Sequence, residues 1–325
     1  MTDTRTTRRH ALQSGLGLGA TLAWPSLRAQ AAFPSAPLRL VIPTPAGGGY
    51  DSLMRVVGAK LTEAWGQPTI VDSKPGASGS LAAGVVAKSP ADGHTVLLTY
   101  SAYLSNQLLQ PNPGYKPSDF APVGMLVLSP IAIGARTSLG VNTLQELVAL
   151  AKAQPGKLSY GSYGQGSGGH FVGELFNAAA GIALNHIPYK GEAPALQDLL
   201  GGQIDTAIAS IGGVSRHPGK IKPLAVASAT RFPVYKDVPT FAEAGLPDVD
   251  MPGWGGLFVP AGTPKAVVEK LTAEFNRIIM LPDVQAKSLE LGFEPVAWGP
   301  DKLNAFLADQ MGKIKRLVDA GRVKG

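Results

Sequence analysis

The sequence lacks cysteine entirely, although it is 325 residues long. This absence excludes disulfide bonds, thiolate metal sites and a lipid anchor on an N-terminal cysteine. The five histidines are far apart and never show H-E-x-x-H spacing, so a metal site is not expected either. With 45% hydrophobic residues, the chain can instead bury a large hydrophobic core.

Motifs of catalysis and nucleotide binding are lacking as well. Neither a G-x-S-x-G nucleophile elbow nor a G-x-x-x-x-G-K-[ST] phosphate loop occurs. Residues 164–169 fit G-x-G-x-x-G, but the next apolar run, 184–187, ends in Pro188-Tyr189-Lys190 and not in the acid that would bind a ribose. We therefore expect neither an enzyme nor a bound cofactor.

A strong excess of one charge is missing from most of the chain. The formal net charge is +6, but residues 1–32 hold four arginines and one aspartate. The remaining 25 basic and 22 acidic residues leave only +3. This balance gives no basis for binding nucleic acid, so nucleic acid is not expected as a partner.

The first 31 residues have the three parts of a signal peptide. Three arginines are followed by a weakly apolar stretch at 11–23 and by the small-residue pattern of residues 29–31. The apolar stretch is too short to span a membrane. We predict cleavage near Ala31 and export to the periplasm, and the pair Arg8-Arg9 also fits a twin-arginine signal.

Glycine-rich loops follow short apolar runs at several points of the chain. The run 38–42 is followed by Gly47, Gly48 and Gly49 and then by a helical pattern. Glycines let the backbone approach a ligand closely, and the first amides of a helix lack acceptors and lie at the positive end of its dipole. Residues 45–51 are therefore expected to cradle an anion, either phosphate or carboxylate.

Apolar runs alternate with helical patterns, which predicts an α/β fold. Proline-bearing crossings near Pro130 and at 231–252 divide this alternation, so we expect two lobes with a ligand cleft between them. The first lobe is predicted to comprise 32–128 and 229–325, and the second 129–228. Each lobe is expected to be a small, mostly parallel sheet flanked by helices.

Loops at the carboxyl ends of parallel strands gather at one edge of a sheet, and here they offer amides and hydroxyls rather than fixed cations. This chemistry suits the reversible capture of a small oxygen-rich anion. The role of Lys190, which lies in one of these loops, stays open. The residues predicted to bind the ligand are Ala46, Gly47, Gly48, Gly49, Tyr50, Asp51, Ser78, Ser101, Tyr103, Ser162, Gln165, Gly166, Ser167, Gly169, His170, Tyr189 and Ser210.

Several motifs together carry a resemblance to a known family. They are Pro37 to Pro43, Ala46-Gly47-Gly48-Gly49-Tyr50-Asp51, Lys74-Pro75-Gly76-Ala77-Ser78-Gly79, Ala91-Asp92-Gly93-His94-Thr95, Pro155-Gly156-Lys157-Leu158, Pro188-Tyr189-Lys190-Gly191, Asp198 to Gln203, Pro239 to Gly245 and Pro260-Ala261-Gly262-Thr263-Pro264. These motifs follow the order of the family over nearly all the mature chain. They resemble the substrate-binding proteins of tripartite tricarboxylate transporters, the Bug family.

The resemblance implies a periplasmic two-lobed binding protein of type II. Such a protein captures a carboxylate and delivers it to a two-component membrane permease, and we expect it to be a monomer. The resemblance also implies that residues 45–51 and 162–170 grip one carboxylate of the ligand, partly through ordered waters.

Two positions depart from the family pattern. Tyr50 stands where members often carry Thr or Ser, and the run 207–210 lacks an aspartate that is common there. We therefore expect a ligand without an ammonium group, such as a di- or tricarboxylate or an aromatic acid. A subunit that reports ligand occupancy to a receptor kinase stays open as an alternative to a transport protein.

Overall fold

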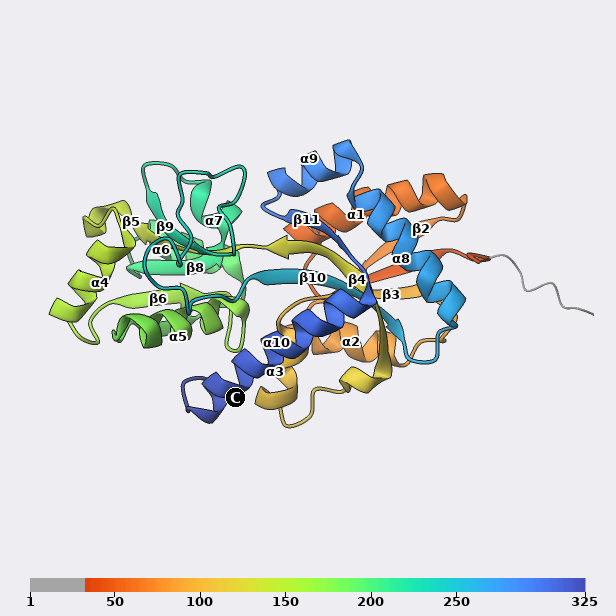
Figure 1. The fold of residues 1–325 in the computed structure, drawn as a ribbon, viewed down its shortest axis with the longest axis horizontal. Coiled ribbons are helices and arrows are strands. Elements are labelled where there is room, and N and C mark those ends of the chain that lie inside the picture. Colours follow the sequence, from red (N-terminus) through yellow and green to blue (C-terminus); the bar gives the residue numbers. More distant parts are fainter. Residues whose placement is uncertain (1–32, 325) are drawn as a thin grey trace, which may run out of the picture. The chain divides into compact units, whose positions relative to one another are not determined.

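The computed structural model describes residues 33–324, so the signal peptide predicted at 1–31 lies outside the described residues. The strands form two sheets, one of six strands and one of five, and helices pack against both (Figure 1). The α/β fold with two lobes, each built on one sheet, is confirmed.

The first sheet has the strand order β11-β4-β10-β3-β1-β2. β1, β2 and β3 are parallel neighbours, whereas β10 runs antiparallel to both β3 and β4, and β11 is antiparallel to β4. Four strands, β1 to β4, thus share one direction. The strands are β1 (Leu38–Ile42), β2 (Thr69–Ser73), β3 (Thr95–Thr99), β4 (Phe120–Ser129), β10 (Gly253–Pro260) and β11 (Glu294–Trp298).

The second sheet has the strand order β7-β6-β8-β5-β9. β6 is parallel to both β7 and β8, and β5 is antiparallel to β8 and β9. All strands except β5 therefore share one direction, as expected for a mostly parallel sheet. The strands are β5 (Ile131–Arg136), β6 (Ser159–Ser162), β7 (Asn185–Pro188), β8 (Thr206–Ser210) and β9 (Ile221–Ala227).

Side chains alternate between the two faces of a strand, and each face of the first sheet has its own helices. Leu38, Leu40 and Ile42 join one core with α1 and α8, whereas Val41 joins another with α2 and α10. The helices are α1 (Gly49–Trp65), α2 (Ser80–Ala87), α3 (Ala102–Leu109), α4 (Leu144–Ala153), α5 (Gly168–Ala180), α6 (Glu192–Leu200), α7 (Ile211–Ser215), α8 (Lys265–Ile279), α9 (Pro282–Glu290) and α10 (Pro300–Asp319), with 3₁₀ turns η1 (Ala77–Gly79), η2 (Pro117–Asp119) and η3 (Thr137–Leu139).

The chain passes between the sheets twice. It leaves the first sheet after β4, crosses at Pro130 and enters the second sheet with β5, and it returns between β9 and β10. We propose lobe boundaries at 128/129 and 228/229 on this basis. Within residues 33–324, no helix combines the length and the apolar character needed to cross a bilayer.

Candidate ligand-binding site

The loop between β6 and α5 is shaped by its own side chains. Ser167 caps α5, and its hydroxyl oxygen accepts the amide of His170 at 3.3 Å. Nδ1 of His170 accepts the amide of Gly166 at 3.1 Å, and the Ser162 hydroxyl lies 2.7 Å from Nε2 of His186. Ser162, Ser167 and His170, all predicted to bind the ligand, thus hold the loop in place.

Two imidazoles that bond to residues of this loop, His170 of α5 and His186 of β7, are neutral. The rings of His170 and His186 stack with their centroids 3.9 Å apart. Burial lowers the pKa of His170 to about 3, with a further contribution from His186, and burial lowers the pKa of His186 to about 4. Neither ring therefore supplies a positive charge at neutral pH.

Glycines at the start of α5 let polar groups from both lobes converge. A methyl group added to Gly168 would lie 2.7 Å from the Tyr163 hydroxyl and 3.3 Å from Oγ of Ser101. A methyl group on Gly169 would lie 2.6 Å from the carbonyl oxygen of Ile208. Because Ser101 follows β3 and Tyr163 follows β6, the start of this helix meets hydroxyls from the two lobes.

The first turn of α1 offers further donors. Among the described residues, the amides of 49–51 have no hydrogen-bond acceptor, because Gly48 caps the helix without a side chain. Gly48 is half-buried, and Ala46, Gly47 and Gly49 are exposed. This helix start thus has the free amides that the sequence predicted for an anion cradle.

Asp51 shapes the loop before α1. Its Oδ2 accepts the amide of Gly47 and Nε of Arg55, both at 2.9 Å. The hydrogen bonds from Arg55 hold the pKa of this buried carboxyl below its usual range, so it is ionised at neutral pH. The carboxylate therefore fixes the backbone that carries the free amides.

Tyr50 and Tyr100 stack beside this helix start. The Tyr50 hydroxyl donates to the carbonyl of Trp254 at 2.9 Å, and its ring lies 4.7 Å from that of Phe293 and 6.2 Å from that of Tyr100. Burial raises the pKa of Tyr100 to about 12 and also raises the pKa values of Tyr50 and Tyr163. All three hydroxyls are protonated at neutral pH and act as uncharged donors.

A carboxylate stands at the end of β8, although the run 207–210 contains none. Glu192, the first residue of α6, accepts the Ser210 amide through Oε2 and the Ser210 hydroxyl through Oε1, both at 2.8 Å. Burial raises the pKa of Glu192, against the opposing effects of Ser210 and Arg216. The prediction of a ligand without an ammonium group rested on the lack of an acid in the run 207–210, and the structure brings an acid from α6 to this place.

The remaining predicted residues make other contacts. Tyr103 lies in the aromatic core of the first lobe. The Tyr189 hydroxyl donates to Oδ2 of Asp198 at 2.7 Å. Ser78 and Gln165 are exposed. None of these four side chains is part of the convergence described above.

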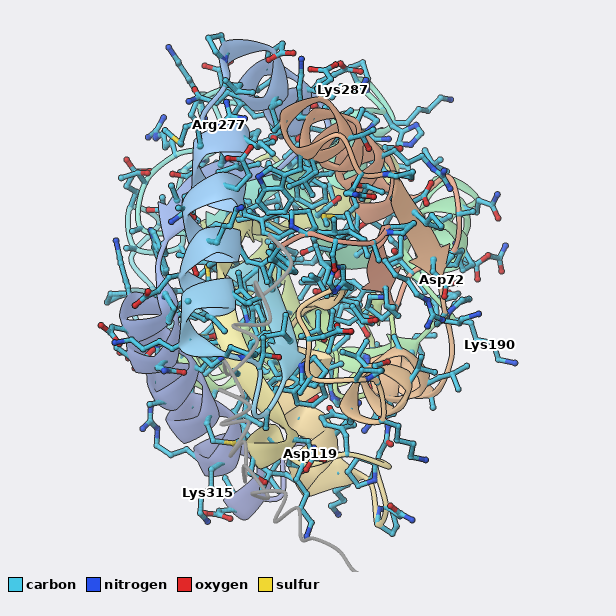
Figure 2. The ribbon with its side chains drawn as sticks, turned by 90° about the vertical axis from the view of Figure 1, so that its right-hand side faces the viewer. Asp72, Asp119, Lys190, Arg277, Lys287 and Lys315 are labelled. Carbon is cyan, nitrogen blue, oxygen red and sulfur yellow. The ribbon has the colours of Figure 1, made fainter. Side chains whose placement is uncertain are left out.

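Lys190, whose role the sequence left open, is exposed and extends outward from the protein (Figure 2). The structure therefore gives it no contact with the polar groups at the starts of α1 and α5. Within residues 33–324, no group of His, Asp or Glu side chains is arranged to hold a metal ion.

Tyr100, Tyr163 and Glu192 belong to this region but were not among the predicted residues. The two tyrosines could have been found, because one directly follows β3 and the other lies inside the glycine-rich loop after β6. Glu192 had no local signal. It reaches the end of β8 from a different element, which only the tertiary structure brings close.

Loops of two lobes that bring a few polar groups together form the kind of site at which small ligands bind between domains. The family model described as the tripartite tricarboxylate transporter family receptor matches residues 53–322. The chain belongs to this family, and the resemblance seen in its sequence is confirmed.

Similar proteins extend over almost the whole chain. BugT of Bordetella pertussis is 34% identical over 291 residues, which are 88% of this chain and 89% of BugT. The structure of Rpa4515 from R. palustris with adipate is 32% identical, with a TM-score of 0.82, and the match covers 90% of this chain and 99% of that chain. MatC from Rhodopseudomonas palustris with bound malate is 31% identical, with a TM-score of 0.77 and coverages of 88% and 100%.

These relationships decide between a binding protein and an enzyme. The members of this family are receptors of a transporter. The structural neighbours of this chain include the periplasmic binding protein BugD. The chain is therefore a solute-binding protein of a transport system and not an enzyme, as the lack of catalytic motifs predicted.

Proposed function

We propose that this protein is a periplasmic receptor that captures a small carboxylate and delivers it to a membrane permease of the tripartite tricarboxylate type. The observation that carries the proposal is the convergence of the Ser101 and Tyr163 hydroxyls on the start of α5. Carboxylate oxygens accept hydrogen bonds from such hydroxyls and from the free amides at helix starts.

The proposed site holds the carboxylate with neutral donors only. The amides of 49–51 supply backbone donors, and Ser101, Tyr100 and Tyr163 supply hydroxyls. Because no cation of the protein pairs with this carboxylate, dissociation of the ligand leaves no unpaired positive charge in the site. The absence of that cost favours release of the ligand to a partner. The adipate and malate in two related structures support the same chemical class for this chain.

Location and partner follow from the same family. The predicted signal peptide and the periplasmic relative BugD support export with cleavage near Ala31. The family takes its name from a tripartite transporter, which supports a membrane permease as the partner.

A thermal-shift screen of the purified mature protein tests the proposal. The panel contains mono-, di- and tricarboxylates, aromatic acids and amino acids. A ligand at 100 times its dissociation constant adds about 2.7 kcal/mol to the free energy of unfolding, which raises the Tm by a few degrees. If no carboxylate raises the Tm of protein shown by mass spectrometry to be free of bound ligand, the proposal is wrong.

A serine pair provides the matched control. Ser101→Ala removes a donor from the site and is expected to weaken binding of the best carboxylate about tenfold. Ser89→Ala removes a hydroxyl that donates to the Val85 carbonyl on α2 and should leave affinity unchanged. Equal effects of the two substitutions would show that Ser101 does not contact the ligand.

A further inference from the structure

Glu192 is held firmly at the end of β8. Both of its carboxylate oxygens accept hydrogen bonds from Ser210, one from the amide and one from the hydroxyl. A methyl group added to Gly213 would lie 2.2 Å from Oε1 of Glu192, so glycine at this position leaves the space that the carboxylate occupies. The side chain is thus fixed in one place by the start of α7.

This carboxylate lies beside the proposed carboxylate site. Ser162 and Ile208 are partners in the parallel pairing of β6 with β8, so the loops that follow these strands start side by side. Tyr163 follows one strand and Ser210 ends the other. When ionised, Glu192 is near enough to the Tyr163 hydroxyl to contribute to the rise of the pKa of Tyr163.

No cation is bonded to Glu192 among residues 33–324. Arg216 acts on it through its charge, but Nε of Arg216 donates to the Gly212 carbonyl at 3.1 Å. Each carboxylate oxygen can accept two hydrogen bonds, and Ser210 supplies one to each. The carboxylate therefore retains capacity to accept hydrogen bonds from another molecule.

Resting on the proposed function, we propose that Glu192 determines ligand specificity by accepting a hydrogen bond from a hydroxyl or ammonium group of the bound carboxylate. The ligand would place its carboxylate at the starts of α1 and α5 and its donor group at Glu192. An ionised second carboxylate at this end would meet a like charge in a poorly solvated place, which is unfavourable. Hydroxycarboxylates and aminocarboxylates are therefore expected to bind more tightly than dicarboxylates of equal length.

Isothermal titration with matched probes tests this inference. One series is 4-hydroxybutanoate, 4-aminobutanoate and succinate, and the other is 6-hydroxyhexanoate, 6-aminohexanoate and adipate. The wild-type protein is expected to bind a donor-bearing acid of at least one series about tenfold more tightly than the dicarboxylate, since hydrogen bonds to charged groups are stronger than those between neutral groups. The hydroxy and amino members show which donor is preferred.

Glu192→Gln keeps the shape of the side chain and an oxygen that can accept from Ser210, but removes the charge. It should reduce the preference over the dicarboxylate at least tenfold. Glu174→Gln is the matched control, because Glu174 is another half-buried glutamate of this lobe whose Oε1 accepts from the Tyr160 hydroxyl at 2.8 Å. This control should keep the wild-type preference.

The outcomes separate this inference from the proposed function. If carboxylates bind but the dicarboxylate binds as tightly as the donor-bearing acids, the role of Glu192 is overturned while the carboxylate site stands. The same conclusion follows if Glu192→Gln keeps the wild-type ratio. If no carboxylate of either series or of the larger panel binds the wild-type protein, the proposed function fails and the inference fails with it. The wild-type ratio decides the question even if the variant does not fold.

Discussion

Ala77 and Ser78 have left-handed backbone conformations, with φ of 47° and 51°. This region costs a residue other than glycine about 1–2 kcal/mol. The side chains of Asn106 and Gln110 donate to the carbonyls of Ser78 and Ala77 at 3.0 and 3.3 Å, and these bonds help to hold the loop in this conformation.

Replacing Ala77 with glycine should therefore increase stability. Glycine relieves the backbone strain but loses about 0.5–1 kcal/mol of chain entropy, so the expected net gain is about 0.5 kcal/mol. Ala286→Gly, at an exposed position inside α9, should instead cost about 1 kcal/mol. Urea unfolding of both variants measures the difference. A loss of stability at Ala77 equal to that at Ala286 would contradict the account.

The stacked histidines predict how stability depends on pH. His186 has a pKa of about 4 in the folded protein and about 6.5 when unfolded. Between these values the unfolded chain binds a proton that the folded protein does not, so stability is fully present above pH 6.5 and falls as the pH is lowered toward 4. The slope is at most about 1.4 kcal/mol per pH unit for this histidine, and His170 acts in the same direction.

Urea unfolding at pH 6.5 and pH 5 measures this slope. His186→Gln should lower it, because glutamine does not titrate, and the contributions of other groups cancel in the comparison. An unchanged slope in this variant would show that the imidazole is not kept neutral by the fold.

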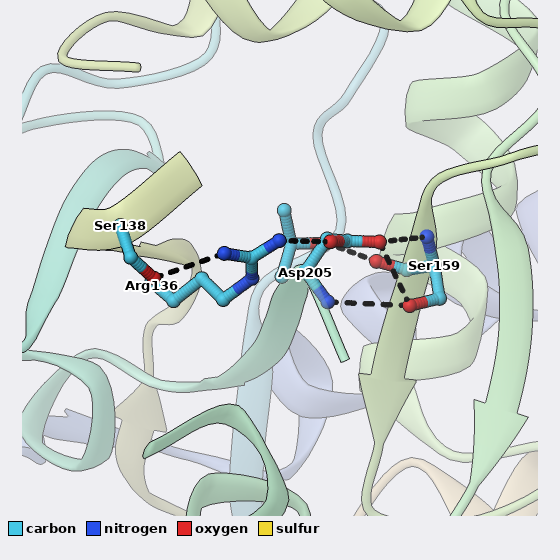
Figure 3. A network of polar contacts seen from close by, with 5 residues as sticks. Arg136, Ser138, Ser159 and Asp205 are labelled. Atoms are coloured by element: carbon cyan, nitrogen blue, oxygen red, sulfur yellow. Dashed lines mark hydrogen bonds and ion pairs between the residues drawn. The ribbon is translucent and has the colours of Figure 1, made fainter. Parts of the chain in front are cut away.

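At the scale of elements, one polar network joins three strands at the edge of the second sheet opposite the ligand loops. Asp205 precedes β8 and accepts from Nη2 of Arg136 at 2.8 Å and from the Ser159 amide at 3.0 Å (Figure 3). Arg136 ends β5, and Ser159 begins β6. The network therefore fixes the relative positions of strands whose other ends carry the proposed site.

Asp205→Ala should lower the free energy of unfolding by about 2 kcal/mol, because it leaves Arg136 and the Ser159 amide without their partner. Asp319→Ala, which breaks an exposed ion pair with Lys315 on α10, should cost less than about 1 kcal/mol. Neither change should alter carboxylate affinity. If Asp205→Ala changed carboxylate affinity with little loss of stability, the network would contribute to the ligand site rather than to the stability of the sheet, which would contradict this account.

The sequence predicted the βα units well, because the apolar run, the glycine-rich loop and the helical pattern of each unit lie within one short stretch of the sequence. It missed β10, whose sequence holds three glycines and ends in proline, against the usual composition of a strand. Its glycines reflect close neighbours: a methyl group on Gly253 would lie 2.5 Å from the Ser129 carbonyl oxygen, and one on Gly255 would lie 2.7 Å from the Tyr50 ring. Contacts of this kind come from distant segments and leave no periodic pattern.

The same limit explains the site. Loop position and residue type pointed to the glycines at the starts of α1 and α5 and to the hydroxyl of Ser101, which the proposed site uses. They were not enough to show that Ser162 bonds to His186 of β7, that His170 bonds to the loop before its own helix, or that Tyr189 bonds to Asp198. Which polar groups remain free for a ligand depends on tertiary contacts.

At the scale of the whole molecule, the lobes meet directly beside the site. The Ser105 hydroxyl on α3 donates to the carbonyl of Gly166 at 2.9 Å. A methyl group on Gly292 would lie 3.3 Å from the backbone of Gly212, so the turn before β11 touches the start of α7. Both contacts join the two lobes, so we expect a ligand enclosed between the lobes to depend on them.

Gly166→Ala should therefore weaken carboxylate binding. Its methyl group would lie 2.5 Å from Cδ1 of Leu109 on α3, so the Leu109 side chain has to shift at this contact between the lobes. Gly140→Ala is the matched control, since Gly140 also has a left-handed φ, 78° against 66°, but nothing within 4 Å. Both variants should lose about 1 kcal/mol of stability, and only Gly166→Ala should lose affinity in calorimetry. Equal affinities would show that this contact does not contribute to binding.

The most direct test of the central claim is a crystal structure of the protein with the best carboxylate from the thermal-shift panel. The account predicts that one carboxylate group lies between the starts of α1 and α5, with its oxygens about 2.7–3.2 Å from backbone amides and from the Ser101 or Tyr163 hydroxyl. A ligand found elsewhere, for example in the cavity of about 430 Å³ lined by Leu175, Asp250 and Arg316, would contradict it.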